Sequence, residues 1–89
     1  MNYIVYILRN SANRLYIGYS KNLPQRLKDH ATGVHGAKFI QDYRELSLVY
    51  TETYLTQLEA MRREKQLKGW TRAKKEALII QDLVLLKQL

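Results

Sequence analysis

The strongest constraint on the fold is the run YIVYIL at residues 3–8, in which β-branched, aromatic and aliphatic residues follow one another without a charged residue. An apolar run of this length is typical of a strand that is buried on both faces. A chain of 89 residues has room for one compact core. We therefore expect residues 3–8 to be a doubly buried strand in a single domain that spans residues 1–89.

A second strand is predicted at residues 15–19, LYIGY, because the polar turn formers RNSANR at residues 9–14 separate it from the first strand. The two strands are expected to form a β-hairpin. With the turn centred near Ser11, Tyr6 lies opposite Tyr16 on the same face of the sheet, with Cβ atoms roughly 5 Å apart. By alternation, Tyr19 faces the other way and is expected to pack.

A helix and a third strand are predicted after the hairpin. The helix starts near Asn22, with Pro24 in its first turn, and stops by Gly33. Residues 32–45 have no stable period and are predicted to be a loop, and residues 46–53, LSLVYTET, are predicted to be the third strand.

Two further helices are expected in the second half of the chain. One begins with a capping box between Thr56 and Glu59, runs to about Lys68 and ends at Gly69 as its C′ residue. At 100° per residue its apolar stripe consists of Ala60, Met61 and Leu67, and its outward residues are Glu59, Arg62, Arg63 and Gln66. The other helix, capped by Thr71, is predicted over residues 72–88. Its end, residues 76–89, is a candidate packing or dimerisation element.

The charge of the chain suggests a polyanionic partner. There are 15 Lys and Arg residues against 8 Asp and Glu, which gives a net charge of +7. A small domain this basic gains salt-sensitive affinity from each phosphate it neutralises, although the same charge can serve solubility alone. The absence of cysteine excludes disulfide and thiolate chemistry. No signal sequence and no apolar run of roughly 20 residues is present, so we expect a cytoplasmic protein with no membrane contact.

Glu64 is the most unusual residue of the second predicted helix, because it falls in the middle of the apolar stripe. A carboxylate on a core-facing stripe is unfavourable unless it is paired or binds a metal. One interpretation is an ion pair with Lys68, four residues later. The other is a ligand of Mg²⁺, which is usually held by carboxylate and phosphate oxygens together with water. The pattern alone favours neither.

Other candidate residues lie on the hairpin and the first helix. Tyr6 and Tyr16 are either core residues with a hydroxyl that finds one partner or members of a site. Arg26 offers a planar cation for phosphate, and His30 is a candidate proton carrier or orienting group. With Glu64, these groups suit phosphodiester cleavage, which needs an activated water, charge stabilisation at the phosphate and help for the leaving oxygen.

The arrangement of these residues resembles the GIY-YIG nuclease superfamily. The resemblance rests on Ile4-Val5-Tyr6, Tyr16-Ile17-Gly18, Arg26 ten residues after Tyr16, and Glu64 in the helix MRREKQLK. It extends over nearly the whole chain and is similar to the small bacterial stand-alone members. It implies an α/β fold with a three-stranded antiparallel sheet flanked by helices, in the order strand, strand, helix, strand, helix, helix.

The resemblance also implies roles for the candidate residues. Tyr6 would be the general base or a phenol that orients the water, and Tyr16 would position the water or the phosphate. Arg26 would stabilise charge on the phosphate, and His30 would support the first tyrosine. Glu64 would be the ligand of a single divalent metal ion, Mg²⁺ or Mn²⁺.

Two functions follow from these expectations. The first is a metal-dependent endonuclease that hydrolyses DNA, whether branched, nicked or single-stranded, as a monomer or a homodimer. The second is a non-catalytic nucleic-acid-binding module on the same scaffold. Gly18 is expected to leave the backbone beside Tyr16 open to a phosphate. The full set of expected DNA-binding residues is Gly18, Lys21, Lys28, Lys38, Arg63, Lys65, Lys68 and Arg72.

Overall fold

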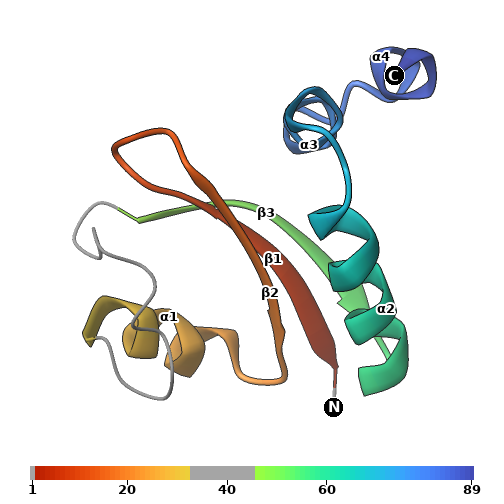
Figure 1. Cartoon of the computed structure of the whole chain (residues 1–89). Coiled ribbons are helices and arrows are strands. Elements are labelled where there is room, and N and C mark those ends of the chain that lie inside the picture. The colour runs from red at the N-terminus through yellow and green to blue at the C-terminus, as the bar shows by residue number, and fades with distance from the viewer. Residues whose placement is uncertain (1, 33–45) are drawn as a thin grey trace.

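A computed structural model describes residues 2–32 and 46–89, without the side chains of residues 28–32. The elements follow in the order β1 (Tyr3–Arg9), β2 (Leu15–Ser20), α1 (Leu23–Thr32), β3 (Ser47–Tyr54), α2 (Gln57–Lys68), α3 (Arg72–Ile79) and α4 (Leu83–Gln88). The strands form one antiparallel sheet in the order β2-β1-β3. Figure 1 shows α1 on one side of this sheet and α2 on the other. The predicted α/β class and three-stranded antiparallel sheet are confirmed.

The inner strand β1 carries the core, as its apolar run predicts. On one face Val5 and Ile7 are completely buried and pack with Ala60 and Leu67 of α2. On the other face Tyr6 and Leu8 pack with Leu23 of α1. Because β1 pairs with β2 along one side and with β3 along the other, β2 and β3 are the edges of the sheet.

The pairing of the hairpin differs from the predicted one. Tyr6 lies opposite Gly18, and Leu8 lies opposite Tyr16, so the expected pairing of Tyr6 with Tyr16 is wrong. The turn is centred one residue later than expected, with Asn13 in the left-handed conformation at φ 65°. The resulting shift of two residues keeps Tyr6 and Tyr16 on the same face, because side chains alternate with a period of two.

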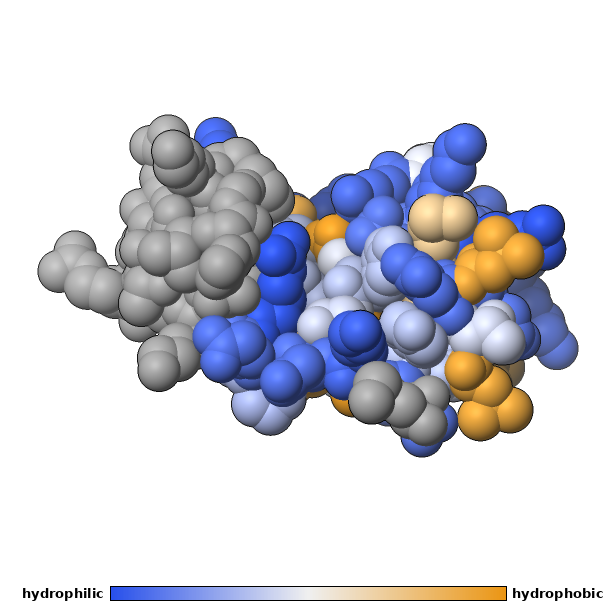
Figure 2. Space-filling model, turned by 90° about the horizontal axis from the view of Figure 1, so that it is seen from below, coloured by the Kyte–Doolittle hydropathy of each residue, from blue (hydrophilic) through white to orange (hydrophobic). Residues whose placement is uncertain are grey.

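Both ends of α2 are defined by local contacts. The Thr56 side chain accepts a hydrogen bond from the Glu59 backbone N–H, which confirms Thr56 as the N-cap, and its hydroxyl donates to the Glu59 carboxylate at 3.0 Å. The helix ends before Gly69, as predicted, but φ of Gly69 is −83° and right-handed, so the C′ conformation expected from a terminal glycine is not adopted. Met61 does not belong to the buried stripe, because 44% of it is exposed. Figure 2 shows hydrophobic side chains gathered on the side where α2 lies.

The expected single helix over residues 72–88 is wrong, because two helices occupy this range. Thr71 caps α3 as predicted, but Gln81 adopts a left-handed φ of 57° and interrupts the helix. The Asp82 side chain then accepts a hydrogen bond from the Leu85 N–H and starts α4. No helix in residues 2–32 and 46–89 is long and apolar enough to cross a membrane. The predicted loop at residues 32–45 lies almost wholly outside the described residues.

Candidate active site

A pocket with a volume of about 570 Å³ lies along the edge strand β2. Four residues that the sequence nominates for catalysis line it: Tyr6 from β1, Tyr16 from β2, Arg26 from α1 and Glu64 from α2. The other lining residues are Leu15, Ile17, Gly18, Tyr19, Lys68 and Lys75. Helices on opposite faces of the sheet therefore contribute to one pocket at its edge.

Gly18 has a different role from the predicted one. A Cβ atom at residue 18 would lie 2.4 Å from Tyr6 Oη and 2.6 Å from Tyr6 Cζ, so the phenol occupies the space above this glycine. The expectation that the missing side chain exposes the backbone to a phosphate is corrected, because the Tyr6 ring fills that space. Gly18 therefore shapes the pocket by admitting the ring of its cross-strand neighbour.

The position of Arg26 follows from the start of α1. The Asn22 side chain accepts a hydrogen bond from the Gln25 N–H at 3.3 Å, and the Asn22 carbonyl accepts one from the Arg26 N–H at 3.0 Å. One turn into the helix, Arg26 Nε donates to Tyr6 Oη at 3.4 Å. The predicted helix start near Asn22, with Pro24 in the first turn, is confirmed.

Tyr6 combines burial with a nearby cation. Only 2% of the residue is exposed. Burial raises the pKa of Tyr6 above its ordinary value of 10.0, while the hydrogen bond and charge of Arg26 act in the opposite direction. The charge of Glu64 raises the pKa further, which also indicates that this carboxylate lies near the phenol. Tyr6 is therefore a neutral phenol at neutral pH in the absence of a ligand.

Asn10 is a residue that the sequence analysis missed. It is 7% exposed, and its Nδ2 donates to Tyr16 Oη at 3.4 Å. Its Oδ1 accepts a hydrogen bond from the Arg14 N–H at 2.9 Å. The same amide thus fixes the hairpin turn and contacts Tyr16. An asparagine in a polar turn segment is common, so its type and position gave no signal of this second contact.

Of the two interpretations of Glu64, the ion pair with Lys68 is present in the structure, and the same residue also lines the pocket. Its carboxylate lines the pocket, its side chain is 19% exposed, and Lys68 Nζ lies 3.3 Å from Oε1. No group of three or more His, Cys, Asp or Glu residues that could hold a metal is found among the residues with described positions. A single carboxylate in an open pocket nevertheless fits Mg²⁺, because this ion keeps several water ligands and takes its other oxygens from substrate phosphate.

Four of the other predicted residues do not line the pocket: Lys21, Arg63, Lys65 and Arg72. Arg63 forms an ion pair with Glu52 and therefore does not point into solvent as expected, and Arg72 forms an ion pair with Glu76. Lys21 and Lys65 are exposed. The side chains of Lys28 and His30 and the whole of Lys38 lie outside the described residues.

The chain belongs to the GIY-YIG family, a nuclease-type family, since the model of the GIY-YIG catalytic domain matches residues 2–77.

Small bacterial relatives share this domain. UPF0213 proteins of Staphylococcus aureus strains Mu3 and N315 are each 42% identical over 78 residues, which is 88% of this chain and 94% of each relative. The solution NMR structure of UPF0213 protein BH0048 from Bacillus halodurans is 39% identical, with a TM-score of 0.59. The structural match covers 89% of this chain and 83% of the BH0048 chain.

Proposed function

We propose that the protein is a metal-dependent endonuclease that hydrolyses phosphodiester bonds of DNA in the pocket along β2. The observation that carries this proposal is the convergence of Tyr6, Arg26 and Glu64 on one pocket from three different elements. Tyrosine and arginine are in hydrogen-bond contact there, 3.4 Å apart. Water attack on a phosphate needs a proton acceptor and a cation in such proximity.

Each residue has a distinct part in the proposed reaction. Tyr6 orients the attacking water and, in its ionised form, accepts the proton of that water at Oη to become a neutral phenol. Arg26 holds a phosphate oxygen and favours the ionised form of the phenol. Tyr16, which Asn10 contacts at 3.4 Å, positions the water or the phosphate from the neighbouring strand. Burial of Tyr6 excludes bulk water from the side of the phenol that faces the core.

Glu64 is the proposed ligand of Mg²⁺ or Mn²⁺. When bound, the ion would neutralise charge on the phosphate and stabilise the leaving oxygen. Lys68 pairs with Glu64 at 3.3 Å and holds this side chain at the pocket wall.

DNA is the proposed partner because cations prevail both in the pocket and over the chain. Among the residues whose side chains are described, Arg26, Lys68 and Lys75 line the pocket, against one carboxylate, that of Glu64. The net charge of the chain is +7. Both features attract a polyanion, and the contacts to its phosphates make binding sensitive to salt.

The alternative is a module that binds nucleic acid without cleaving it. The ion pair between Lys68 and Glu64 favours this reading, because an ammonium group beside the carboxylate can take the place of a metal ion. In such a protein Glu64 would serve only to hold Lys68 at the pocket.

Cleavage and binding assays on the same substrates distinguish the two functions. The purified chain is incubated with labelled duplex, nicked, branched and single-stranded DNA, in Mg²⁺, in Mn²⁺ and in chelator. Metal-dependent cutting of any of these substrates supports the endonuclease. A salt-dependent mobility shift with no cutting in either metal across the panel supports the binding module and contradicts the proposed reaction.

A further inference from the structure

Lys75 lies in the pocket but has no role in the proposed chemistry. It comes from α3 and is half-buried. Within residues 2–27 and 46–89, where side chains are described, no hydrogen bond or ion pair engages its ammonium group. Glu64, the carboxylate that lines the pocket, is already paired with Lys68. A pocket-lining lysine without a counter-ion among these residues favours an anionic ligand.

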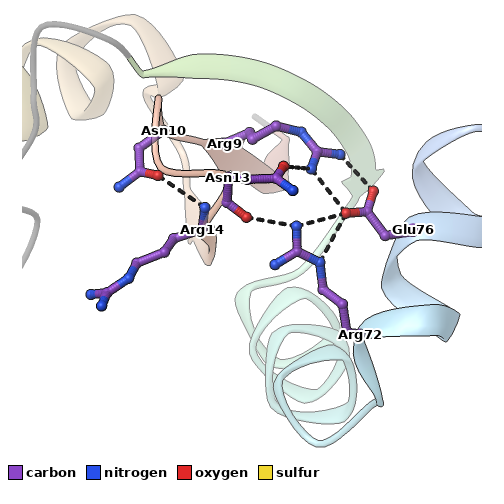
Figure 3. Close-up of polar contacts among 6 residues, drawn as sticks. All are labelled: Arg9, Asn10, Asn13, Arg14, Arg72 and Glu76. Carbon is purple, nitrogen blue, oxygen red and sulfur yellow. Dashed lines mark hydrogen bonds and ion pairs between the residues drawn. The ribbon is translucent and has the colours of Figure 1, made fainter.

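The helix that carries Lys75 is attached to the hairpin by an ion-pair network, which we call the hairpin clamp: Arg9, Asn13, Arg72 and Glu76. Figure 3 shows these side chains turned toward one another. Arg9 donates from both terminal nitrogens to the Glu76 carboxylate, at 2.6 and 2.9 Å. Arg72 donates to the Asn13 carbonyl at 2.6 Å and to Glu76 at 2.9 Å. Lys75 immediately precedes Glu76 and is therefore held relative to the hairpin that bears β2.

Lys74, the preceding residue, has a different environment. Its Nζ lies 5.7 Å from the centre of the Trp70 ring, and it does not line the pocket. The two neighbouring lysines carry the same charge on the same helix, yet only one of them contributes to the pocket wall. They form a matched pair for separating a specific contact from a general effect of charge.

We propose that Lys75 binds a backbone phosphate adjacent to the one that is cleaved, and that the hairpin clamp positions it for this contact. The assignment of the ligand as nucleic acid rests on the proposed function. A lysine suits this role because it interacts with phosphate as a point charge and does not require a fixed fork geometry. Lys75 would thus set how the strand lies along β2 without taking part in the chemistry.

The first test measures DNA binding in chelator, where no cleavage takes place. Fluorescence anisotropy with a labelled duplex gives the affinity of the wild type, Lys75→Ala and Lys74→Ala over a range of salt concentrations. We expect Lys75→Ala to bind several-fold more weakly at low salt and to reduce the slope of log K against log salt by about 1. Lys74→Ala should keep the wild-type slope. Equal effects of the two substitutions, or no measurable binding by the wild type, would overturn the proposal.

The second test addresses the clamp. Glu76→Gln removes a negative charge, and general electrostatics alone would then strengthen DNA binding. If the clamp positions Lys75, binding weakens instead, and Lys75→Ala has a smaller effect in the Glu76→Gln background than in the wild type. Arg9→Lys keeps the positive charge but cannot donate from two nitrogens to the Glu76 carboxylate. It should therefore also weaken DNA binding. Circular dichroism and thermal unfolding establish that each variant is folded. Tighter binding by folded Glu76→Gln would contradict the positioning role.

Cleavage gives an independent measurement that separates this inference from the proposed function. In metal, Lys75→Ala should raise KM with little change in kcat, because the phosphate that it binds is not the reacting one. If the wild type binds DNA but does not cut it, the proposed reaction fails and the binding test of Lys75 remains decisive. If Lys75→Ala binds and cuts like the wild type, the role of Lys75 fails and the nuclease stands.

Discussion

At the scale of single residues, the contact between Tyr6 and Gly18 determines the shape of the pocket. Tyr6 is one of the largest completely buried side chains, and its ring reaches across β2 at the one position of that strand that has no side chain. The hydroxyl oxygen on this ring accepts a hydrogen bond from Arg26 Nε, and both residues line the pocket. The position of a reactive phenol therefore depends on the absence of a single carbon atom at residue 18.

Substitution of Gly18 is expected to impair both activity and stability. In Gly18→Ala the new Cβ would lie 2.4 Å from Tyr6 Oη, so the phenol must move. We expect a stability loss of about 1–3 kcal/mol from overpacking, and a fall in cleavage of roughly 100-fold from misplacement of the phenol. Cleavage rate and thermal unfolding check the two effects.

Gly69→Ala is the matched control for this substitution. Its nearest neighbour would be the Gln66 carbonyl oxygen at 3.5 Å, which is an ordinary contact. Its φ of −83° suits alanine as well. Wild-type cleavage in Gly18→Ala would show that the position of the Tyr6 ring is not needed for activity.

The pKa of Tyr6 predicts how cleavage depends on pH. Burial raises this pKa above 10.0 despite the opposing effect of Arg26, so the ionised fraction grows about tenfold per pH unit across the neutral range. A reaction that uses the ionised phenol should therefore speed up steadily from pH 6 to pH 9 under single-turnover conditions. Tyr6→Phe should abolish this slope and most of the rate. A flat profile in the wild type would exclude Tyr6 as the proton acceptor.

At the scale of elements, α2 is attached to β3 by a polar cluster around Glu52. Arg63 Nε and Nη2 donate to its two carboxylate oxygens at 2.8 and 2.9 Å. Tyr50 and Tyr54 donate to the same carboxylate at 2.6 and 2.7 Å. Burial opposes ionisation of Glu52, but the hydrogen bonds from Arg63 and the two tyrosines hold its pKa below the ordinary value.

Arg63→Ala should destabilise the fold through loss of this cluster. The paired side chains of Arg63 and Glu52 are only 21% and 15% exposed, so removal of the arginine leaves a partly buried carboxylate without its cation. We expect a decrease of about 2–4 kcal/mol in the free energy of unfolding. Arg62→Ala, on the exposed face of the same helix, should change it by less than about 0.5 kcal/mol. Denaturant unfolding measures both, and equal changes would argue against a structural role for Arg63.

Sequence alone was sufficient to predict the elements with strong local signals. The apolar run of β1, the Thr56 capping box and the Asn22 start of α1 depend on contacts within a few residues. The hairpin pairing and the break before α4 depend on left-handed backbone at Asn13 and Gln81, which nothing in the pattern of apolar residues indicates.

The candidate site shows the same division between local and long-range contacts. Its motif residues could be nominated from their spacing. The buried contacts of Arg63, the position of Lys75 and the link between Asn10 and Tyr16 depend on which elements meet in space. A helix wheel contains no information about contacts with β3. It therefore predicted a solvent-exposed Arg63, whereas Arg63 is partly buried in its ion pair with Glu52.

At the scale of the whole molecule, the pocket and the apolar C-terminal segment are separate. The pocket is formed by residues up to Lys75, and the family match ends at residue 77. Beyond them, Ile80, Leu83 and Val84 are 67%, 62% and 71% exposed. Helix α4 has no buried residue. None of residues 80–89 lines the pocket, so the proposed active site does not use this segment directly.

A chain that ends at Gln81 tests this separation. It keeps Ala77 and Leu78, which are buried, and every pocket residue, so we expect cleavage within a few-fold of the full chain. Sedimentation of the two chains determines whether the exposed apolar residues support self-association. A truncated chain that is folded but inactive would show that the segment contributes to the site, for instance through a second copy.

Single-turnover DNA cleavage in Mg²⁺ measures whether Glu64 makes the β2 pocket a metal-dependent active site. Glu64→Gln keeps the shape of the side chain and removes the charge that would hold the ion, so the rate should fall at least about 100-fold. Glu59→Gln makes the same change on the same helix and preserves the capping box, so its rate should match the wild type. Cleavage by Glu64→Gln at the wild-type rate would show that the Glu64 carboxylate is not the required metal ligand.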